Sequence, residues 1–425
     1  MPTETLMMKD SKNTWYGNIP TDWVINKYKF ICKISSGDAM SPEDLDDSYE
    51  YEVYGGGKLI GFANSYNTQN CILIGRVGAN CGCINNISDK CWATDNALIL
   101  KTSSNKNYMN YLLMASNLND INESNAQPLI TASKVLNFKI PFTCNINEQQ
   151  AIADFLDEKC EKIDKVIGEI EEQIQVLEDY KKSLITETVT KGLDKNVPMK
   201  DSGVDYIGKI PEKWNIIRLK HFSYMKGRIG WQGLSSDEFI DEGPYLVTGT
   251  DFKDGEVQWD RCYHISQKRY NEAWQIQLKI GDLLVTKDGT IGKLAYIHFL
   301  PDNASLNSHL LLIRPLKNKY TNKFLYWVLS SQLFKTYYEL ASTGAIMDSL
   351  SQEKIGNFSF AIPEIDEQKQ IADYLDKECT KIDKTINDKK EQLETIKEYK
   401  KSLIYEYVTG KKRVACWGEL WNQTE

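Results

Sequence analysis

The 425-residue sequence contains no continuous apolar run of about 18 residues, the length that a membrane-spanning helix needs. Its first residues, MPTETLMMKDSKNTW, also lack the apolar core of a signal peptide. These two absences predict a cytoplasmic protein. Basic residues are fewer than acidic ones, 51 Lys and Arg against 59 Asp and Glu, which gives a net charge of −8. That balance argues against a protein that binds nucleic acid by overall charge alone.

The sequence also has few patterns that mark metal sites or catalysis. Its ten cysteines are scattered, as is typical of free thiols in a reducing compartment. Cys71, Cys81, Cys83 and Cys91 form no C-x2-C pair and have no His nearby, so no zinc site is predicted. The Asp/Asn-Pro-Pro-aromatic motif of amino-methyltransferases is absent, and G-T-I-G-K at 289–293 lacks the spacing of a phosphate loop. We therefore expect no metal, no cofactor and no catalytic residue in this chain.

One three-residue pattern could be read as catalytic. Glu367, Gln368 and Lys369 have the E-x-K form found in metal-dependent nucleases. The matching positions 148–150 read E-Q-Q, without the Lys, and both triplets begin a predicted helix. Because an acidic side chain stabilises the exposed N–H groups of a first helical turn, we interpret both as helix starts.

What the sequence does contain is an internal duplication. Residues 148–190 recur at 367–409, with roughly 24 of 43 paired residues identical and no gap. Upstream, the segments 8–11 and 17–23 recur 191 positions later as 199–202 and 208–214, each ending in I-P-x-x-W. The repeat unit is therefore a linker, a module and the duplicated segment, used twice.

Each duplicated segment predicts one long helix, because no Pro interrupts it and apolar residues recur every seven positions. At 1.5 Å per residue such a helix is about 65 Å long, too long to bury its apolar stripe against one compact module, so the two should pair as a coiled coil. Lys389 interrupts the second stripe, and the flanking positions include Val166, Tyr180 and Tyr399. The predicted coiled-coil core comprises Leu156, Ile163, Ile170, Leu177, Leu184, Leu375, Ile382, Ile396 and Leu403.

The modules between these segments read as β-rich, with helices near their ends. Strands are expected over 24–34, 54–58, 71–78, 96–100 and around 140–141 in the first module, and over 215–224, 245–251, 281–290, 308–314 and around 362–363 in the second. Helices are expected over 108–117 and 322–340. The predicted domains are 1–147 and 192–365, with long helices at 148–191 and 366–410 and a tail at 411–425.

Charge is unevenly distributed along the chain. Residues 148–191 carry 12 acids against 6 bases, and residues 38–52 carry seven acids and no base. Bases predominate in the modules, with 11 against 4 acids over 261–335 and 7 against 4 over 53–147. The excess of acidic residues therefore belongs to the first long helix and one loop, and the modules are locally basic.

Together, I-P-x-x-W, E-Q-x-x-I-A-x-x-L-D, K-I-D and Y-K-K-S-L-I, each present twice, resemble the specificity subunit (HsdS) of type I restriction-modification systems over nearly the whole chain. The resemblance implies an α+β fold: two mixed α/β target-recognition domains, separated by an antiparallel coiled coil and related by a pseudo-twofold axis. It also implies that the chain is not an enzyme. Two methyltransferase subunits, and restriction subunits in the full complex, would be its partners, and S-adenosylmethionine and ATP would bind to those partners.

The resemblance further implies that each module reads one half of a split, asymmetric double-stranded DNA site while the coiled coil sets the gap. Base reading should come from polar loop side chains, whose donors and acceptors match base edges. The candidates are Lys58, Arg76, Asn80, Asn125 and Gln127 in the first module, and Thr250, Asp251, Lys287, Asp288, Thr290, Ser342 and Thr343 in the second. Two alternatives stay open: a fused DNA-modifying enzyme, and a coiled-coil adaptor whose modules bind something other than DNA.

Overall fold

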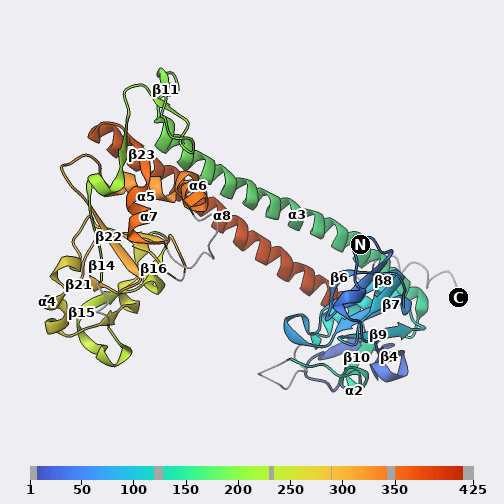
Figure 1. Ribbon diagram of the computed structural model, residues 1–425. Coiled ribbons are helices and arrows are strands. Elements are labelled where there is room, and N and C mark those ends of the chain that lie inside the picture. Colours follow the sequence, from blue (N-terminus) through green and yellow to red (C-terminus); the bar gives the residue numbers. More distant parts are fainter. Residues whose placement is uncertain (1–6, 119–127, 229–233, 289, 342–349, 415–425) are drawn as a thin grey trace. The chain divides into compact units, whose positions relative to one another are not determined.

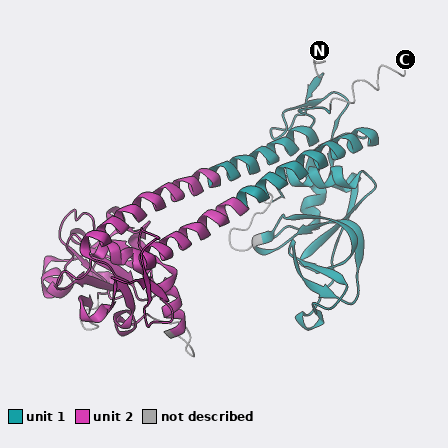
Figure 2. Cartoon of the chain, turned by 90° about the horizontal axis from the view of Figure 1, so that it is seen from above, with its two compact units in different colours: residues 1–171, 390–425 teal, residues 172–389 magenta. Residues whose placement is uncertain are grey.

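The computed structural model describes residues 7–118, 128–228, 234–288, 290–341 and 350–414. The chain divides into two compact units, residues 1–171 with 390–425, and residues 172–389. Figure 2 shows that each unit takes one module and a segment of both long helices. Each unit thus combines parts of the chain that are far apart in the sequence.

The two long helices are α3 (Ile146–Lys191) and α8 (Ile365–Val408), both unbroken (Figure 1). In the first unit, Lys400 Nζ lies 2.6 Å from Asp164 Oδ1 and Lys397 Nζ lies 3.1 Å from Glu171 Oε1. In the second, Lys181 Nζ lies 2.6 Å from Asp383 Oδ2. Along α3 the paired positions rise from 164 to 181, while their partners on α8 fall from 400 to 383. The predicted antiparallel pairing is therefore confirmed.

The seam between the helices is narrower than the sequence suggests. Leu156, Ile170, Leu375, Ile382 and Leu403 are buried, and Ile163, Leu177, Leu184 and Ile396 are half-buried. The flanking positions Val166, Tyr180 and Tyr399 were wrongly assigned to this stripe, since they are 42%, 55% and 58% exposed. A pair of helices buries mainly its a and d positions, and the neighbouring positions face outward.

Lys389, which interrupts the apolar stripe of α8, is accommodated by a polar contact. Its Nζ donates to Gln173 Oε1 on α3 at 2.6 Å. A long lysine stem can lie along the seam while its charged end reaches a polar partner. The interruption in the heptad pattern therefore leaves the helix intact.

The first module is built on a six-stranded sheet, covered by α1 (Lys106–Ala115) and followed by α2 (Ala132–Asn137). The strand order is β4 (Cys32–Ser36), β9 (Ala97–Thr102), β7 (Thr68–Gly75), β8 (Ile84–Ala93), β5 (Tyr51–Gly55), β6 (Lys58–Ala63). Two small antiparallel pairs complete it, β1 (Met8–Asp10) with β2 (Asn18–Pro20), and β3 (Val24–Lys27) with β10 (Lys139–Phe142). The apolar ends of both long helices, including Leu156 and Val408, join its core.

The second module repeats this plan with a smaller main sheet, ordered β14 (Ser223–Gly227), β22 (Leu310–Pro315), β19 (Leu283–Thr286), β20 (Leu294–Tyr296). A second sheet contains β18 (Tyr263–His264), β15 (Ile240–Val247) and β21 (Ala304–Leu306). The small pairs are β11 (Met199–Asp201) with β12 (Lys209–Pro211), β13 (Asn215–Arg218) with β23 (Ser359–Ile362), and β16 (Phe252–Lys253) with β17 (Glu256–Val257). Its helices are α4 (Gln267–Glu272), α5 (Asn322–Ser330), α6 (Gln332–Ala341) and α7 (Gln352–Asn357).

The first predicted strand of each module is in fact two strands. Residues 24–34 contain β3, a short 3₁₀ turn over Tyr28–Phe30, and the start of β4. The Tyr28 N–H donates to Phe138 O, and the Leu219 N–H of the second module donates to Phe358 O. The chain leaves one sheet and enters another at this turn. The predicted strand over 281–290 likewise ends at Thr286.

The repeated motifs lie at the same junction in both units. Trp23 Nε1 donates to Glu148 Oε2 at 3.2 Å, and Trp214 Nε1 lies 3.3 Å from both carboxylate oxygens of Glu367. Gln149 and Gln368 accept from the backbone N–H groups of Asn105 and Thr321, both at 2.9 Å. The I-P-x-x-W and E-Q motifs therefore fasten each module to the start of a long helix. Glu148 and Glu367 lie in the first turns of α3 and α8, as expected, but their carboxylates accept from tryptophan ring N–H groups.

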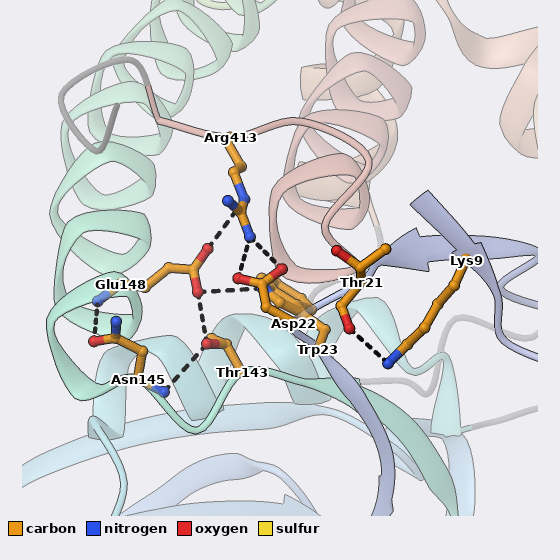
Figure 3. Close-up of polar contacts among 8 residues, drawn as sticks. All are labelled: Lys9, Thr21, Asp22, Trp23, Thr143, Asn145, Glu148 and Arg413. Atoms are coloured by element: carbon orange, nitrogen blue, oxygen red, sulfur yellow. Dashed lines mark hydrogen bonds and ion pairs between the residues drawn. The ribbon is translucent and has the colours of Figure 1, made fainter. Parts of the chain in front are cut away.

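In the first unit the chain beyond α8 joins this junction. Figure 3 shows Arg413 between Asp22 and Glu148, with its Nε 3.4 Å from Glu148 Oε1. Glu148 is 4% exposed and also accepts from Thr143 Oγ1 at 2.6 Å. The second unit has Lys213 where the first has Asp22. This fastening by an arginine is therefore a feature of the first unit.

Candidate nucleic-acid interface

Three predicted residues of the first module meet at one end of its main sheet. Arg76 follows β7, Lys58 begins β6, and Asn80 lies in the turn after Arg76. Asn85 Nδ2 donates to Gly57 O at 3.0 Å, and a Cβ added to Gly57 would lie 3.1 Å from Asn80 O. Gly57 has a φ of +91°, so a glycine permits this close approach of the two turns.

Arg76 is held in place by its main chain and its side chain. Its N–H donates to Asn96 O at 3.1 Å, and its carbonyl accepts from Ile130 N–H at 2.9 Å. Its Nη1 donates to Ser36 Oγ at 2.8 Å and to Asp95 O at 3.3 Å. A half-exposed guanidinium fixed in this way keeps further donors for base edges or phosphates.

Lys287 occupies the corresponding place in the second module. Its N–H donates to His309 O and its carbonyl accepts from Leu350 N–H, both at 2.8 Å. A Cβ added to Gly227, at the end of β14, would lie 3.2 Å from Lys287 Nζ. Arg76 reaches Ser36 at the end of β4 in the same manner. The two modules therefore present a basic residue in the same frame of hydrogen bonds.

The remaining described candidates of the second module surround Lys287. Asp288 Oδ2 lies 3.2 Å from His309 Nδ1, and Thr290 is exposed in the turn that follows. Thr250 is exposed, and a Cβ added to neighbouring Gly249 would lie 2.9 Å from Thr286 Cγ2. These contacts place Thr250, Asp288 and Thr290 beside Lys287 at the end of β19.

Asp251 lies apart from this exposed group. It is 2% exposed, and its carboxylate accepts from the Thr248 N–H at 2.7 Å and the Thr248 hydroxyl at 2.9 Å. These bonds cap a short 3₁₀ turn, so the carboxylate supports the backbone that presents Thr250. Four further candidates, Asn125, Gln127, Ser342 and Thr343, lie outside the described residues.

Several residues at these two ends were not found from the sequence. Ser36, Asn96 and His309 complete the frames around Arg76 and Lys287. Arg228, after β14, is 6% exposed and donates to Leu306 O at 2.8 Å and to Ser305 Oγ at 3.1 Å. Burial lowers the pKa of Arg228 to about 10, which leaves the guanidinium charged at neutral pH. A basic residue four positions after the strand predicted over 215–224 was the available signal.

Neither metal binding nor membrane insertion is indicated within the described residues. No group of three or more His, Cys, Asp or Glu side chains is arranged there to hold a metal ion. Cys71, Cys81 and Cys91 are buried and Cys83 is exposed, all as free thiols. In this part of the chain no helix combines the length and apolar character needed to cross a bilayer.

Comparison with known proteins gives a consistent family. A family model described as the type I restriction modification DNA specificity domain matches residues 20–176 and 211–395. The chain is 28% identical over 327 residues to a putative type I restriction enzyme MjaX specificity subunit of Methanocaldococcus jannaschii, covering 75% of this chain and 72% of the relative. It is 27% identical to the MjaVIII specificity subunit of the same organism, covering 65% and 63%.

A solved structure supports the fold. It comes from work on complex assembly and conformational transition of a type I restriction-modification system, and its chain superimposes with a TM-score of 0.67 at 14% identity. The match covers 93% of this chain and 99% of that one. At such low identity the likeness concerns the architecture of modules and long helices.

Proposed function

Because the chain belongs to the family of type I restriction-modification DNA specificity proteins, we propose that each of its modules reads one half of a bipartite DNA site. The observation that supports this most strongly is the shared frame around Arg76 and Lys287. Each frame holds a basic side chain at the end of a sheet, among turns with further donors and acceptors. Such side chains can contact base edges in the major groove, and guanine is the base that Arg and Lys most often contact.

The target should be asymmetric, because the two frames carry different side chains. Arg76 has Asn80 and Lys58 beside it, whereas Lys287 has Asp288, Thr290 and Thr250. Different sets of donors and acceptors select different bases. We expect the two half-sites to differ in sequence and to be separated by bases that neither module reads.

The gap between the half-sites is the proposed task of α3 and α8. Each helix runs through both units without a break. A rigid pair of helices converts its length into a set number of base pairs. The side chains that face outward from the seam, among them Tyr180 and Tyr399, provide apolar surface for protein partners.

We infer that the partners are two methyltransferase subunits, with restriction subunits in the full complex. Methyl transfer and DNA cleavage would then be carried out by those subunits, which would bind S-adenosylmethionine and ATP. This chain would supply recognition and would carry no catalytic group. Its first long helix, with 12 acids against 6 bases over 148–191, fits a protein contact better than a contact with DNA phosphates.

Methylome sequencing tests the proposal directly. A host expressing this chain with its cognate methyltransferase subunit should contain methyladenine in one split motif. Absence of any split motif would remove the DNA-reading function and favour a coiled-coil adaptor. Modification or cutting of DNA by the purified chain alone would instead favour a fused enzyme.

A further inference from the structure

A cavity of about 880 Å³ lies within the second unit, beside Lys287 and outside the predicted reading residues. Its walls come from the β16–β17 turn (252–255), the β19–β20 turn (291–294), helices α5 and α6, and Lys182 of α3. Buried Phe252, Phe334 and Leu350 contribute to its apolar lining. The cavity is thus formed where the module meets its own segment of the long helix.

Cations outnumber anions around this cavity. Its lining includes Lys182, Lys253, Lys293 and Lys335, against Asp254 and Glu339. Lys335 pairs with Glu339 at 3.8 Å, and Lys182 pairs with Asp179 at 2.9 Å. The side chains of Lys253 and Lys293 have no hydrogen-bond or ion-pair partner within the described residues. We call the space bounded by these four lysines the lysine cleft.

The lysine cleft is continuous with the proposed reading surface. Lys293 N–H donates to Thr286 Oγ1 at 2.9 Å, and Thr286 N–H donates to Lys293 O at 3.0 Å. Thr286 directly precedes Lys287, whose carbonyl accepts from Leu350 in the cleft wall. The cleft wall is therefore bonded to the turn that carries Lys287, and Lys182 of α3 lines the same cleft.

The turn that carries Lys253 is fixed by close packing against α5. A Cβ added to Gly255, whose φ is +81°, would lie 2.4 Å from Tyr326 Oη on α5, so only glycine allows this packing. Tyr338 also lines the cleft, and its hydroxyl is buried and has no hydrogen-bond partner within the described residues. Ammonium groups donate to phosphate oxygens, so Lys253 and Lys293 favour a phosphate-bearing ligand.

We propose that the lysine cleft holds backbone phosphates of the duplex next to the half-site read by the second module, on the side of the long helices. This inference rests on the proposed function, since it concerns the same DNA. The contact is independent of base sequence, and it contributes affinity and orientation while Lys287 and its neighbours select bases. Free nucleotides also carry phosphate groups, and the experiment below distinguishes duplex DNA from a free nucleotide as the ligand.

The test compares the double variant Lys253→Gln with Lys293→Gln against a matched control, Lys268→Gln with Lys279→Gln. The control lysines are exposed in the same unit but do not line the cleft. Each chain is assembled with its methyltransferase subunit, and duplex affinity is measured from low to physiological salt. Log affinity falls as log salt rises, with a slope of about −0.9 per phosphate contact. Loss of two contacts should therefore make this slope less steep by about 2. The control should keep the wild-type slope.

Methylome sequencing of the same variants separates this inference from the function it rests on. The cleft variant should weaken binding and leave the methylated motif unchanged. A wild-type slope in the cleft variant, with a normal split motif, would overturn the cleft assignment and leave the proposed function standing. Absence of the motif in the wild type would overturn both. Saturable binding of ATP to the DNA-free chain, lost in the cleft variant while its salt slope stays normal, would assign the cleft to a free nucleotide and overturn the duplex contact.

Discussion

Arg76 donates from Nη1 to the hydroxyl of Ser36 at 2.8 Å, which ties the basic residue after β7 to the end of β4. In the second module Lys287 extends toward Gly227, which ends β14 as Ser36 ends β4. A fixed cation can discriminate between bases because little side-chain freedom is lost when it binds.

Replacing either cation should affect one half of the DNA site only. Arg76→Ala should cost about 1–3 kcal/mol of discrimination at one base in one half-site, and Lys287→Ala should do the same in the other. Methylome sequencing would show one degenerate position in each variant. Lys101→Ala, an exposed lysine further along β9, should leave both halves unchanged. Loss of specificity in both halves from either replacement would contradict independent reading.

Arg413 should stabilise the first unit through the buried carboxylate of Glu148. Arg413→Ala removes a cation beside a side chain that is 4% exposed, so we expect a loss of about 1–3 kcal/mol in the free energy of unfolding. Lys412→Ala, which removes the exposed pair with Glu406, should cost less than about 1 kcal/mol. Denaturant unfolding measures both, and equal losses would exclude a special role for Arg413.

The length of the helices should determine the gap between half-sites. Deleting residues 172–178 and 387–393 removes one heptad from facing parts of α3 and α8. Seven residues shorten a helix by about 10 Å, which corresponds to about 3 base pairs. The methylated motif should therefore have a shorter gap and the same half-sites. An unchanged gap would refute the role of the helices in spacing.

The outward tyrosines of the helices should contribute to assembly. Tyr180→Ala and Tyr399→Ala remove side chains that are 55% and 58% exposed, so folding should be little affected. We expect weaker binding of methyltransferase subunits, measured as the subunit ratio by mass photometry across a dilution series. Tyr49→Ala in the first module, 38% exposed, is the control. Wild-type assembly in the double variant would place the protein contact elsewhere.

The long helices could be predicted because their signal is local. A heptad repeat without Pro predicts a helix, and two similar apolar stripes in one chain predict that the helices pair. The same reasoning failed for Val166, Tyr180 and Tyr399, because periodicity does not say how wide the buried seam is. The break after Lys27 was missed because Tyr28 bonds to Phe138, more than 100 residues later.

The candidate interface was only partly predictable for a related reason. Arg76 and Lys287 stand out as basic residues after apolar runs, but their equivalence depends on partners such as Asn96 and His309. The modules differ too much in sequence to align these positions. Asp251 shows a second limit of the sequence. Its loop position suggested a contact with bases, but its carboxylate accepts hydrogen bonds from Thr248 within the same turn.

The most direct measurement is the methylated motif of a chain with two copies of the first module. Residues 215–362, from β13 to β23, would be replaced by a second copy of residues 24–142, from β3 to β10, because both segments begin and end in one antiparallel strand pair. If each module reads its own half-site, the new motif should be an inverted repeat of the half-site of the first module, with the original gap. A motif that keeps the second wild-type half-site, or one that is not split, would contradict the account.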